Sequence, residues 1–178
     1  MLDRVIITPA TEDDWAAFGR IRLASLREPG SPQAASLGRE EGFREPHWRM
    51  RLRGTMYLLA WEDEDRRRAV GVIGLMQEPG APVEERLIVS LYVRASHRRQ
   101  GIGKALLRAA THWAAVDDAK VVSAWIVDGE DPAVALFSRS GFEPTGERVR
   151  LPRSPERYEA RWSLGLVTDD VVEQRREV

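Results

Sequence analysis

The residues with the clearest chemical potential form a short basic loop near the middle of the chain, Arg98-x-x-Gly101-x-Gly103. Glycine has no Cβ, so the backbone can come close to a ligand at these two positions. The loop leads into a run with helical periodicity, and a helix start carries unpaired N–H groups and roughly half a positive elementary charge. Further basic or potentially basic side chains surround the loop: Arg94, His97, Arg99 and Lys104. The spacing therefore predicts a site for a phosphate group.

The glycine spacing excludes the two best-known nucleotide motifs. The chain has neither G-x-G-x-x-G nor G-x-x-x-x-G-K-[ST], so neither a Rossmann dinucleotide site nor a P-loop is supported. The alternative is a loop that only turns a corner and exposes solvated arginines. Two glycines and five basic or potentially basic side chains at one helix start favour the phosphate site.

The elements that position this loop can be read from the periodicity on either side of it. An apolar run at residues 87–93 predicts a strand before the loop, and residues 120–127 predict a second strand after the helix. Strand, helix and strand form a βαβ unit with parallel strands. One helical stripe is expected to pack on the sheet: Ile102, Ala105, Leu106, Ala109 and Trp113.

The remaining segments predict a mixed sheet with several more helices. Five further elements come before the loop: a strand at 3–8, a helix that Thr11 caps and that ends near Glu28, a polar helix at 37–53 interrupted or bent at Pro46, and antiparallel strands at 55–62 and 69–76. Three follow it: a helix opened by Asp131-Pro132 and closed by Gly141, then strands at 142–151 and 157–166.

Length and composition place the chain among ordinary globular proteins. The 178 residues predict one domain at 1–167 and a C-terminal tail at 168–178. A net charge of −1 gives no overall attraction to nucleic acid or to anionic membranes. The absence of cysteine excludes disulfides, thiolate metal sites and a Cys nucleophile, and three scattered histidines predict no metal site. No run approaches the ~20 apolar residues of a membrane span, so we expect a soluble, cytoplasmic protein with no membrane partner.

Two linked motifs resemble those of the GCN5-related N-acetyltransferase (GNAT) family. The pattern R/Q-x-x-G-x-G/A between a strand and a helix is similar to the family's acyl-CoA signature, and the segment 131–142, DPAVALFSRSGF, resembles a second signature. The order of elements resembles that fold over nearly all of residues 3–166. The resemblance implies a single-domain α/β fold with a mixed sheet of about seven strands, a central parallel pair and about four helices. It also implies acetyl-CoA as cosubstrate and an amine acceptor, and homodimers are common among similar proteins.

The resemblance also implies roles for individual residues at the cofactor. The main chain of Leu91, Tyr92 and Val93 would bind the pantetheine arm like an added strand. The loop and helix start would bind the diphosphate through Arg98, Arg99, Gln100, Gly101, Ile102, Gly103 and Lys104. Asp131 stands where relatives use Asn toward the pantetheine, while Ala135, Phe137 and Ser138 would line the thioester end.

Two departures affect catalysis. Many relatives place a Tyr that protonates the CoA thiolate where this chain has Phe137, which has no proton to give. A thiol pKa of about 8.5 makes departure as a thiolate cost only ~2 kcal/mol at neutral pH, so solvent, Ser138 or Tyr158 are the candidate acids. Relatives often carry a Glu or His base on the central strand, where this chain has Leu87 and Val89.

A carboxylate elsewhere must then help the amine to lose its proton. A lysine-like amine has a pKa of about 10.4, so its deprotonation at neutral pH costs ~4–5 kcal/mol. Glu85 is the first candidate, with Glu41 and Glu159 behind it.

We therefore expect an acetyl-CoA-dependent N-acetyltransferase that works by direct attack of the amine in a ternary complex. The acceptors left open are a small metabolite, an amino-acid derivative, an antibiotic amine and a protein amine. The alternative is a catalytically weak acyl-CoA-binding sensor or partner subunit, which Phe137 and the missing strand acid would suit. Nucleic-acid binding is disfavoured because the basic loop is short and its charge is balanced elsewhere.

Overall fold

One seven-stranded mixed sheet organises the part of the chain that the structure describes, residues 5–151 and 154–166. In this computed structural model the strand order is β1-β2-β3-β4-β5-β7-β6, and only β4 and β5 run parallel. The predicted fold class is confirmed, with five α-helices where about four were expected. The predicted tail at 168–178 lies outside the described residues.

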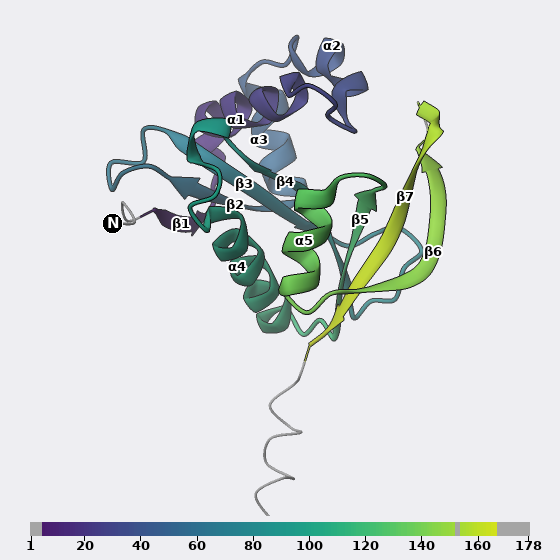
Figure 1. The fold of residues 1–178 in the computed structure, drawn as a ribbon. Coiled ribbons are helices and arrows are strands. Elements are labelled where there is room, and N and C mark those ends of the chain that lie inside the picture. The colour runs from purple at the N-terminus through teal and green to yellow at the C-terminus, as the bar shows by residue number, and fades with distance from the viewer. Residues whose placement is uncertain (1–4, 152–153, 167–178) are drawn as a thin grey trace, which may run out of the picture.

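Figure 1 shows the strands and helices in their order along the chain. The strands are β1 (Ile6–Pro9), β2 (Met56–Trp61), β3 (Ala69–Met76), β4 (Glu85–Val93), β5 (Val121–Val127), β6 (Glu143–Leu151) and β7 (Ser154–Gly165). The helices are α1 (Trp15–Arg27), α2 (Leu37–Glu40), α3 (Glu45–Gly54), α4 (Ile102–Val116) and α5 (Asp131–Arg139), with 3-10 turns η1 (Glu12–Asp14), η2 (Ala34–Ser36) and η3 (Ala95–His97). No helix among these residues is long and apolar enough to cross a bilayer.

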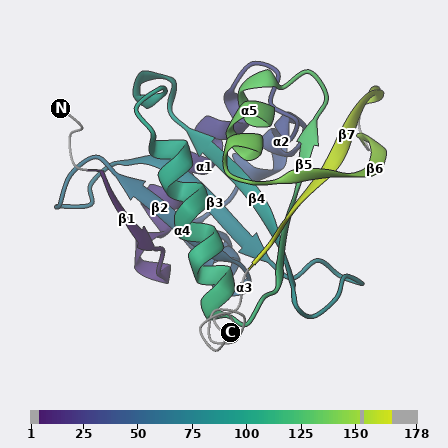
Figure 2. The same ribbon diagram turned by 60° about the horizontal axis from the view of Figure 1, so that its bottom comes forward.

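The helices cover the sheet from both sides (Figure 2). Helices α4 and α5 pack on one face around a core that includes Ile73, Leu106 and Phe142. Helices α1 and α3 pack on the other face around Phe18 and Trp48. We call these the α4 face and the α1 face of the sheet.

The stripe predicted for α4 is partly wrong. The buried residues of this helix are Ile102, Leu106, Leu107, Ala110 and Ala114. Trp113 is 39% exposed, Ala105 is also exposed and Ala109 is half-buried. Four of these residues, Ile102, Leu106, Ala110 and Ala114, follow i, i+4 spacing, and the helix lies so close to β3 that a Cβ on Gly71 would come within 2.8 Å of Leu106 Cδ1.

The second predicted helix is two helices rather than one bent at Pro46. Helix α2 ends at Glu40 and α3 begins at Glu45, so the break precedes the proline. Pro46 lies in the first turn of α3, where its missing N–H would have had no helical partner. Proline here starts a helix instead of breaking one.

Candidate active site

The strands β4 and β5 separate halfway along their length. They pair in parallel only from Glu85↔Val121 to Ile88↔Ala124. Beyond that point β4 continues to pair with β3, and β5 continues to pair with β7. The second half of β4 therefore presents to β5 a main-chain edge that no described strand pairs.

A bulge in β4 marks the start of this divergence. The register of β4 against β3 shifts between Tyr92 and Val89, and Ser90 has a φ of 57°. A left-handed backbone at a non-glycine residue costs about 1–2 kcal/mol, so the surrounding structure must hold it.

A buried ionic network provides that support from α1 and α2. Arg22 donates to the carboxylate of Glu40 through Nε at 2.9 Å and Nη2 at 3.0 Å, and Arg51 donates to the same carboxylate at 2.7 Å. Arg22 Nη1 also donates to Ser90 Oγ at 3.2 Å. Burial raises the pKa of Glu40, but the hydrogen bonds and charges of the two arginines outweigh it and hold that pKa below its ordinary value.

The loop before α4 presents a row of free donors. Among the described residues, no main-chain N–H from residue 99 to residue 104 donates to a protein acceptor. Gly101 is the N-cap of α4 with a φ of +80°, and a Cβ there would meet no atom within 4 Å. Six consecutive N–H groups at the start of a 15-residue helix can bind an anion, and the space beside Gly101 is open to receive it.

The basic side chains of this loop divide into two kinds. Arg94 donates to the carbonyl of Ala69 at 3.0 Å, and Arg98 donates to the carbonyl of Val93 at 3.0 Å. These two arginines hold the loop in place. Arg99 and Lys104 are exposed and form no hydrogen bond or ion pair through their side chains with other described residues, so both are free to meet a ligand.

Other side chains in and next to the loop form hydrogen bonds and ion pairs with neighbouring residues of the chain. Arg98 Nη2 lies 2.8 Å from Glu28 Oε1, and Gln100 Nε2 donates to the carbonyl of Ser96 at 3.4 Å. Tyr92 turns toward α1 and donates its hydroxyl to Glu28 at 3.1 Å. Burial and the nearby Glu28 carboxylate raise the pKa of Tyr92. The side chains of Leu91 and Val93 pack on the α4 face instead.

Helix α5 places the residues predicted at the thioester end in different surroundings. Asp131 and Ser138 are exposed, and Ala135 is half-buried. Phe137 is buried and packs edge-on against Phe142, with ring centroids 5.0 Å apart. Phe137 is thus part of the core as well as of the motif.

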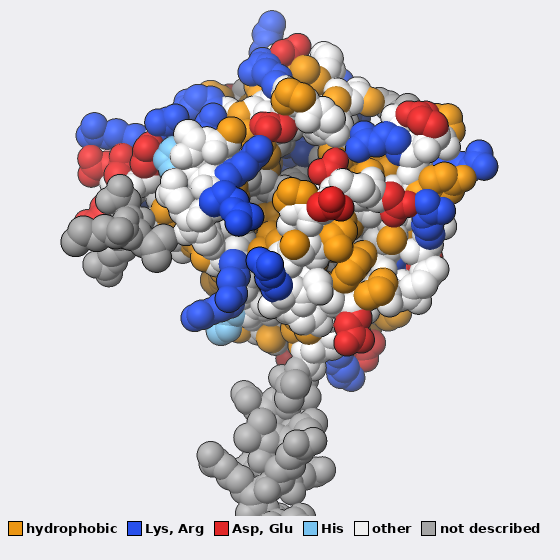
Figure 3. Space-filling view, in the orientation of Figure 1, with side chains coloured by type: hydrophobic (Ala, Val, Ile, Leu, Met, Phe, Trp, Pro, Cys, Tyr) orange, Lys and Arg blue, Asp and Glu red, His pale blue; other side chains and the backbone are white. Residues whose placement is uncertain are grey.

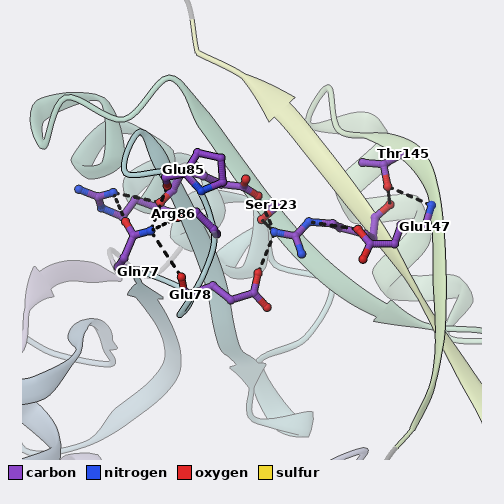
Figure 4. A network of polar contacts seen from close by, with 10 residues as sticks. Gln77, Glu78, Glu85, Arg86, Ser123, Thr145 and Glu147 are labelled. Atoms are coloured by element: carbon purple, nitrogen blue, oxygen red, sulfur yellow. Dashed lines mark hydrogen bonds and ion pairs between the residues drawn. The ribbon is translucent and has the colours of Figure 1, made fainter.

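Glu85, the first predicted base, is already bound by an arginine. Arg161 Nη2 lies 2.6 Å from Glu85 Oε1, and the same nitrogen donates to Ser123 and to Glu78 at 2.8 Å (Figure 4). Burial raises the pKa of Glu85, but the hydrogen bonds of Arg161 and Ser123 and the arginine charge lower it below its ordinary value. A carboxylate with a lowered pKa is a weaker proton acceptor.

Tyr158, a predicted acid, lies on the opposite face of the sheet. Its hydroxyl accepts from Arg150 Nε at 3.1 Å, and the guanidinium of Arg148 lies 4.0 Å from its ring centroid. Along β7 it alternates with Arg161, which faces Glu85. The structure therefore does not bring Glu85 and Tyr158 together, and Ser138 lies exposed on α5, apart from either contact.

The two remaining carboxylate candidates differ in their surroundings. Glu41 is a surface residue that accepts from Arg27 at 2.8 Å. Glu159 is half-buried on β7, on the same face as Arg161, and forms no hydrogen bond or ion pair with the other described residues. Burial raises the pKa of Glu159.

Two cavities lie among the described residues, on either side of α4. A cavity of about 460 Å³ lies far from the loop, between the ends of β2 and β3 and the last turns of α4. A second of about 180 Å³ lies between α4 and α5 beside Lys104 and Arg108. No group of His, Asp and Glu residues in this part of the chain is arranged to hold a metal.

Comparisons with known proteins agree with this geometry. The family described as Acetyltransferase (GNAT) family matches residues 18–142. The curated N-acetyltransferase family 8 member 3 of Rattus norvegicus is 31% identical over 93 residues, which cover 51% of this chain and 41% of that protein. The chain thus spans less than half the length of this relative.

Solved structures share the fold at low sequence identity. The acetyltransferase of the GNAT family from Streptococcus pneumoniae superposes with a TM-score of 0.73 and 16% identity, covering 92% of this chain and 100% of that chain. Arabidopsis thaliana NAA60, solved in complex with a bisubstrate analogue, superposes with a TM-score of 0.66 and 13% identity, covering 92% of this chain and 100% of that chain.

Proposed function

The chain belongs to the GNAT acetyltransferase family, and from that membership we propose that it moves an acetyl group from acetyl-CoA to an amine. The amine attacks the thioester directly while both substrates are bound. The observation that carries this proposal is the row of six free N–H groups at residues 99–104, next to the open space at Gly101. A diphosphate is the anion that such a row suits best, because it offers several oxygens to successive donors.

The unpaired edge of β4 supports the same proposal. The pantetheine arm carries amide groups that can pair with a strand edge, and the second half of β4 has lost its neighbour β5. Leu91 to Val93 would hold this arm through their main chain, between the diphosphate at α4 and the bulge at Ser90. An N–H near the bulge would polarise the thioester carbonyl. Arg99 and Lys104 add positive charge for the phosphates.

The names of two similar proteins support an acetyl donor and an amine acceptor. A curated relative is named an N-acetyltransferase, and one structural neighbour carries a bisubstrate analogue, a compound that joins both substrates in one molecule. We therefore propose an amine as acceptor and a ternary complex as the reacting species.

A glycine pair tests the cofactor site. Gly101 and Gly80 have φ values of +80° and +85°, and a Cβ on either meets nothing within 4 Å. Gly101→Val and Gly80→Val therefore suffer the same backbone strain, but only the first places a side chain beside the donors. One lost charge-assisted hydrogen bond costs about 1.5–3 kcal/mol, which corresponds to about 10- to 100-fold weaker binding.

Calorimetry with CoA measures the effect without knowledge of the acceptor. We expect Gly101→Val to weaken CoA binding by that factor and Gly80→Val to leave the Kd within twofold of the parent. Equal weakening in both variants, or no heat of binding in the parent, contradicts the proposed site.

A second candidate function is acyl-CoA sensing without efficient turnover. Phe137 favours it, because a phenyl ring cannot protonate the departing thiolate. A panel of primary amines with acetyl-CoA, monitored for free thiol, separates the two functions. Turnover of any amine above the rate of hydrolysis supports the enzyme, whereas tight CoA binding with no turnover supports the sensor.

A further inference from the structure

On the α1 face, helices α1 and α3 pack on β2, β3 and β4 rather than on β5 and β7 (Figure 1). The register between these strands runs without interruption from Val121↔Gly165 to Val127↔Glu159. Glu159 and Arg161 therefore share this face with Trp125 and Ser123. Figure 3 shows a hollow between α1 and α2 on one side and α5 on the other, bordered by acidic, basic and hydrophobic side chains.

Arg161 lies at the end of this face near Glu85, and carboxylates balance its charge. Arg161 forms ion pairs with Glu85 at 2.6 Å and Glu78 at 2.8 Å, and Glu147 lies 3.9 Å from its Nε. Its guanidinium also lies 5.2 Å from the ring centroid of Trp125. Three carboxylates around one arginine leave it little charge to offer a fourth.

Arg157 lies at the other end of this face and also has partners of its own. Arg157 donates to the carbonyl of Gly30 at 3.4 Å and lies 3.5 Å from Glu130 Oε1. Across the strands from Glu159 stand only apolar residues, Val127 on β5 and Val149 on β6. Glu159 thus lies between two arginines that have other partners, and it has none among the described residues.

The level of Glu159 along the sheet matches the proposed cofactor segment. Since Ile88 is opposite Ala124 and the bulge adds one residue to β4, continuing the count along both strands places Val127, and with it Glu159, near the level of Tyr92. Glu85 is level with Val121 at the other end of the pair. Six positions along β5 separate Val121 from Val127, which is about 20 Å at ~3.3 Å per residue.

We propose that Glu159 receives the acceptor: its carboxylate binds the ammonium group of a primary amine and takes one proton from it. This inference rests on the proposed function and names the chemistry of the second substrate. A half-buried carboxylate without a cation costs the folded protein energy unless a ligand supplies the cation. An alcohol or a neutral amide would leave that charge unpaired.

The reaction then balances as follows in atoms and protons. Glu159 takes a proton from the ammonium group and passes it to solvent, and the free lone pair of the nitrogen attacks the acetyl carbonyl. A C–N bond forms and the C–S bond breaks. The second nitrogen proton goes to the departing CoA thiolate through solvent. Burial raises the pKa of Glu159 toward the pKa of the amine. The smaller difference between the two pKa values lowers the free-energy cost of the first proton transfer.

The carboxyl group itself can be observed without knowledge of the natural acceptor. In protein labelled with 13C at the glutamate carboxyl carbons, the signal lost in Glu159→Gln is that of Glu159. The probes are n-butylamine and n-butanol, each added to the CoA complex at tens of millimolar. An ammonium within ~4–6 Å lowers a carboxyl pKa by about 1–3, so we expect butylamine to lower the pKa of Glu159 and butanol to leave it unchanged.

Stability provides a second readout. A raised pKa in the folded state means that the charged carboxylate disfavours folding above its unfolded pKa, and that the penalty disappears when both states are protonated. Glu159→Gln should therefore raise the Tm at pH 7 and match the parent near pH 3. Glu156→Gln, an exposed position on the same strand, is the matched control and should change neither the Tm nor the CoA affinity.

The outcomes separate this proposal from the proposed function. If CoA binds but the pKa of Glu159 is ordinary and insensitive to butylamine, the role of Glu159 is wrong and the cofactor site stands. If Glu85→Gln, and not Glu159→Gln, removes the acid limb of the pH profile of turnover, the base is Glu85. If CoA does not bind, both proposals fail together.

Discussion

Replacing Glu40 by Gln should remove the charge that holds Arg22 beneath the β4 bulge. The Glu40 side chain is fully buried and that of Arg22 is 6% exposed, so neither can turn to water. Glutamine keeps the shape of glutamate but is neutral, and one of its two terminal groups is a donor that faces the guanidinium. Arg22 would then be a buried cation without a counterion.

The size of the effect follows from this burial. Removing one partner of a buried ion pair costs about 3–5 kcal/mol, because the other charge stays desolvated and unpaired. For a chain of this length 1 kcal/mol moves the Tm by about 2–4 °C, so a fall of about 10 °C is expected. Glu41→Gln is the matched control, since its pair with Arg27 is about half exposed on both sides and worth ~0–1 kcal/mol.

The pKa of Glu40 determines how the loss of stability in Glu40→Gln should change with pH. The folded pKa of Glu40 lies below its ordinary value, so its contribution is complete above the unfolded carboxyl pKa of about 4.3 and disappears as the pH falls through the folded pKa. Thermal unfolding by circular dichroism should show a large gap between parent and variant at pH 7 that narrows below pH 4. A gap at pH 7 no larger than that of the control would refute the reasoning, as would a gap that widens with acid.

Two further predictions concern the sheet. Gly74→Ala should lower the free energy of unfolding by about 1–3 kcal/mol, because the new Cβ would lie 2.7 Å from Cε1 of the buried Tyr57 ring. Chemical denaturation measures this free energy, and a loss below 0.5 kcal/mol would contradict the prediction. Arg161→Met should destabilise the protein by about 2–3 kcal/mol at pH 7, because it leaves the buried carboxylate of Glu85 without its cation. The same substitution should raise the pKa of Glu85. The loss should shrink toward pH 4, where the carboxyl is protonated, and an equal loss at both pH values would exclude this cause.

The loop and helix at residues 98–116 could be predicted from the sequence because their determinants are local. Glycine at the N-cap, a basic run and an amphipathic helix lie within one contiguous stretch, and the structure places Gly101 at the helix N-cap. The antiparallel and parallel pairings of β2, β3, β4 and β5 were likewise predictable, because strand–turn and strand–helix–strand order permits few topologies.

The rotation of α4 and the partner of Glu85 could not be predicted in this way. Ala105 and Ala109 are as apolar as Ala110 and Ala114, so residue type does not decide which pair faces the sheet. The arginine that binds Glu85 lies 76 residues away in the chain. Strand parity gives the face on which a carboxylate lies, but not the charges that other strands bring to it.

The bulge at Ser90 relates the separation of β4 from β5 to the buried ion pair of Arg22 and Glu40. A strand that continued regularly past Ile88 would keep pairing with β5, and no main-chain edge would be free for a ligand. The left-handed Ser90 ends that pairing, and Arg22, with its charge balanced by Glu40, holds the hydroxyl of Ser90 at 3.2 Å. The buried ion network thus lies at the point where β4 leaves β5. Its support of a left-handed backbone gives a reason for a charged pair at a position that apolar residues would fill at lower cost.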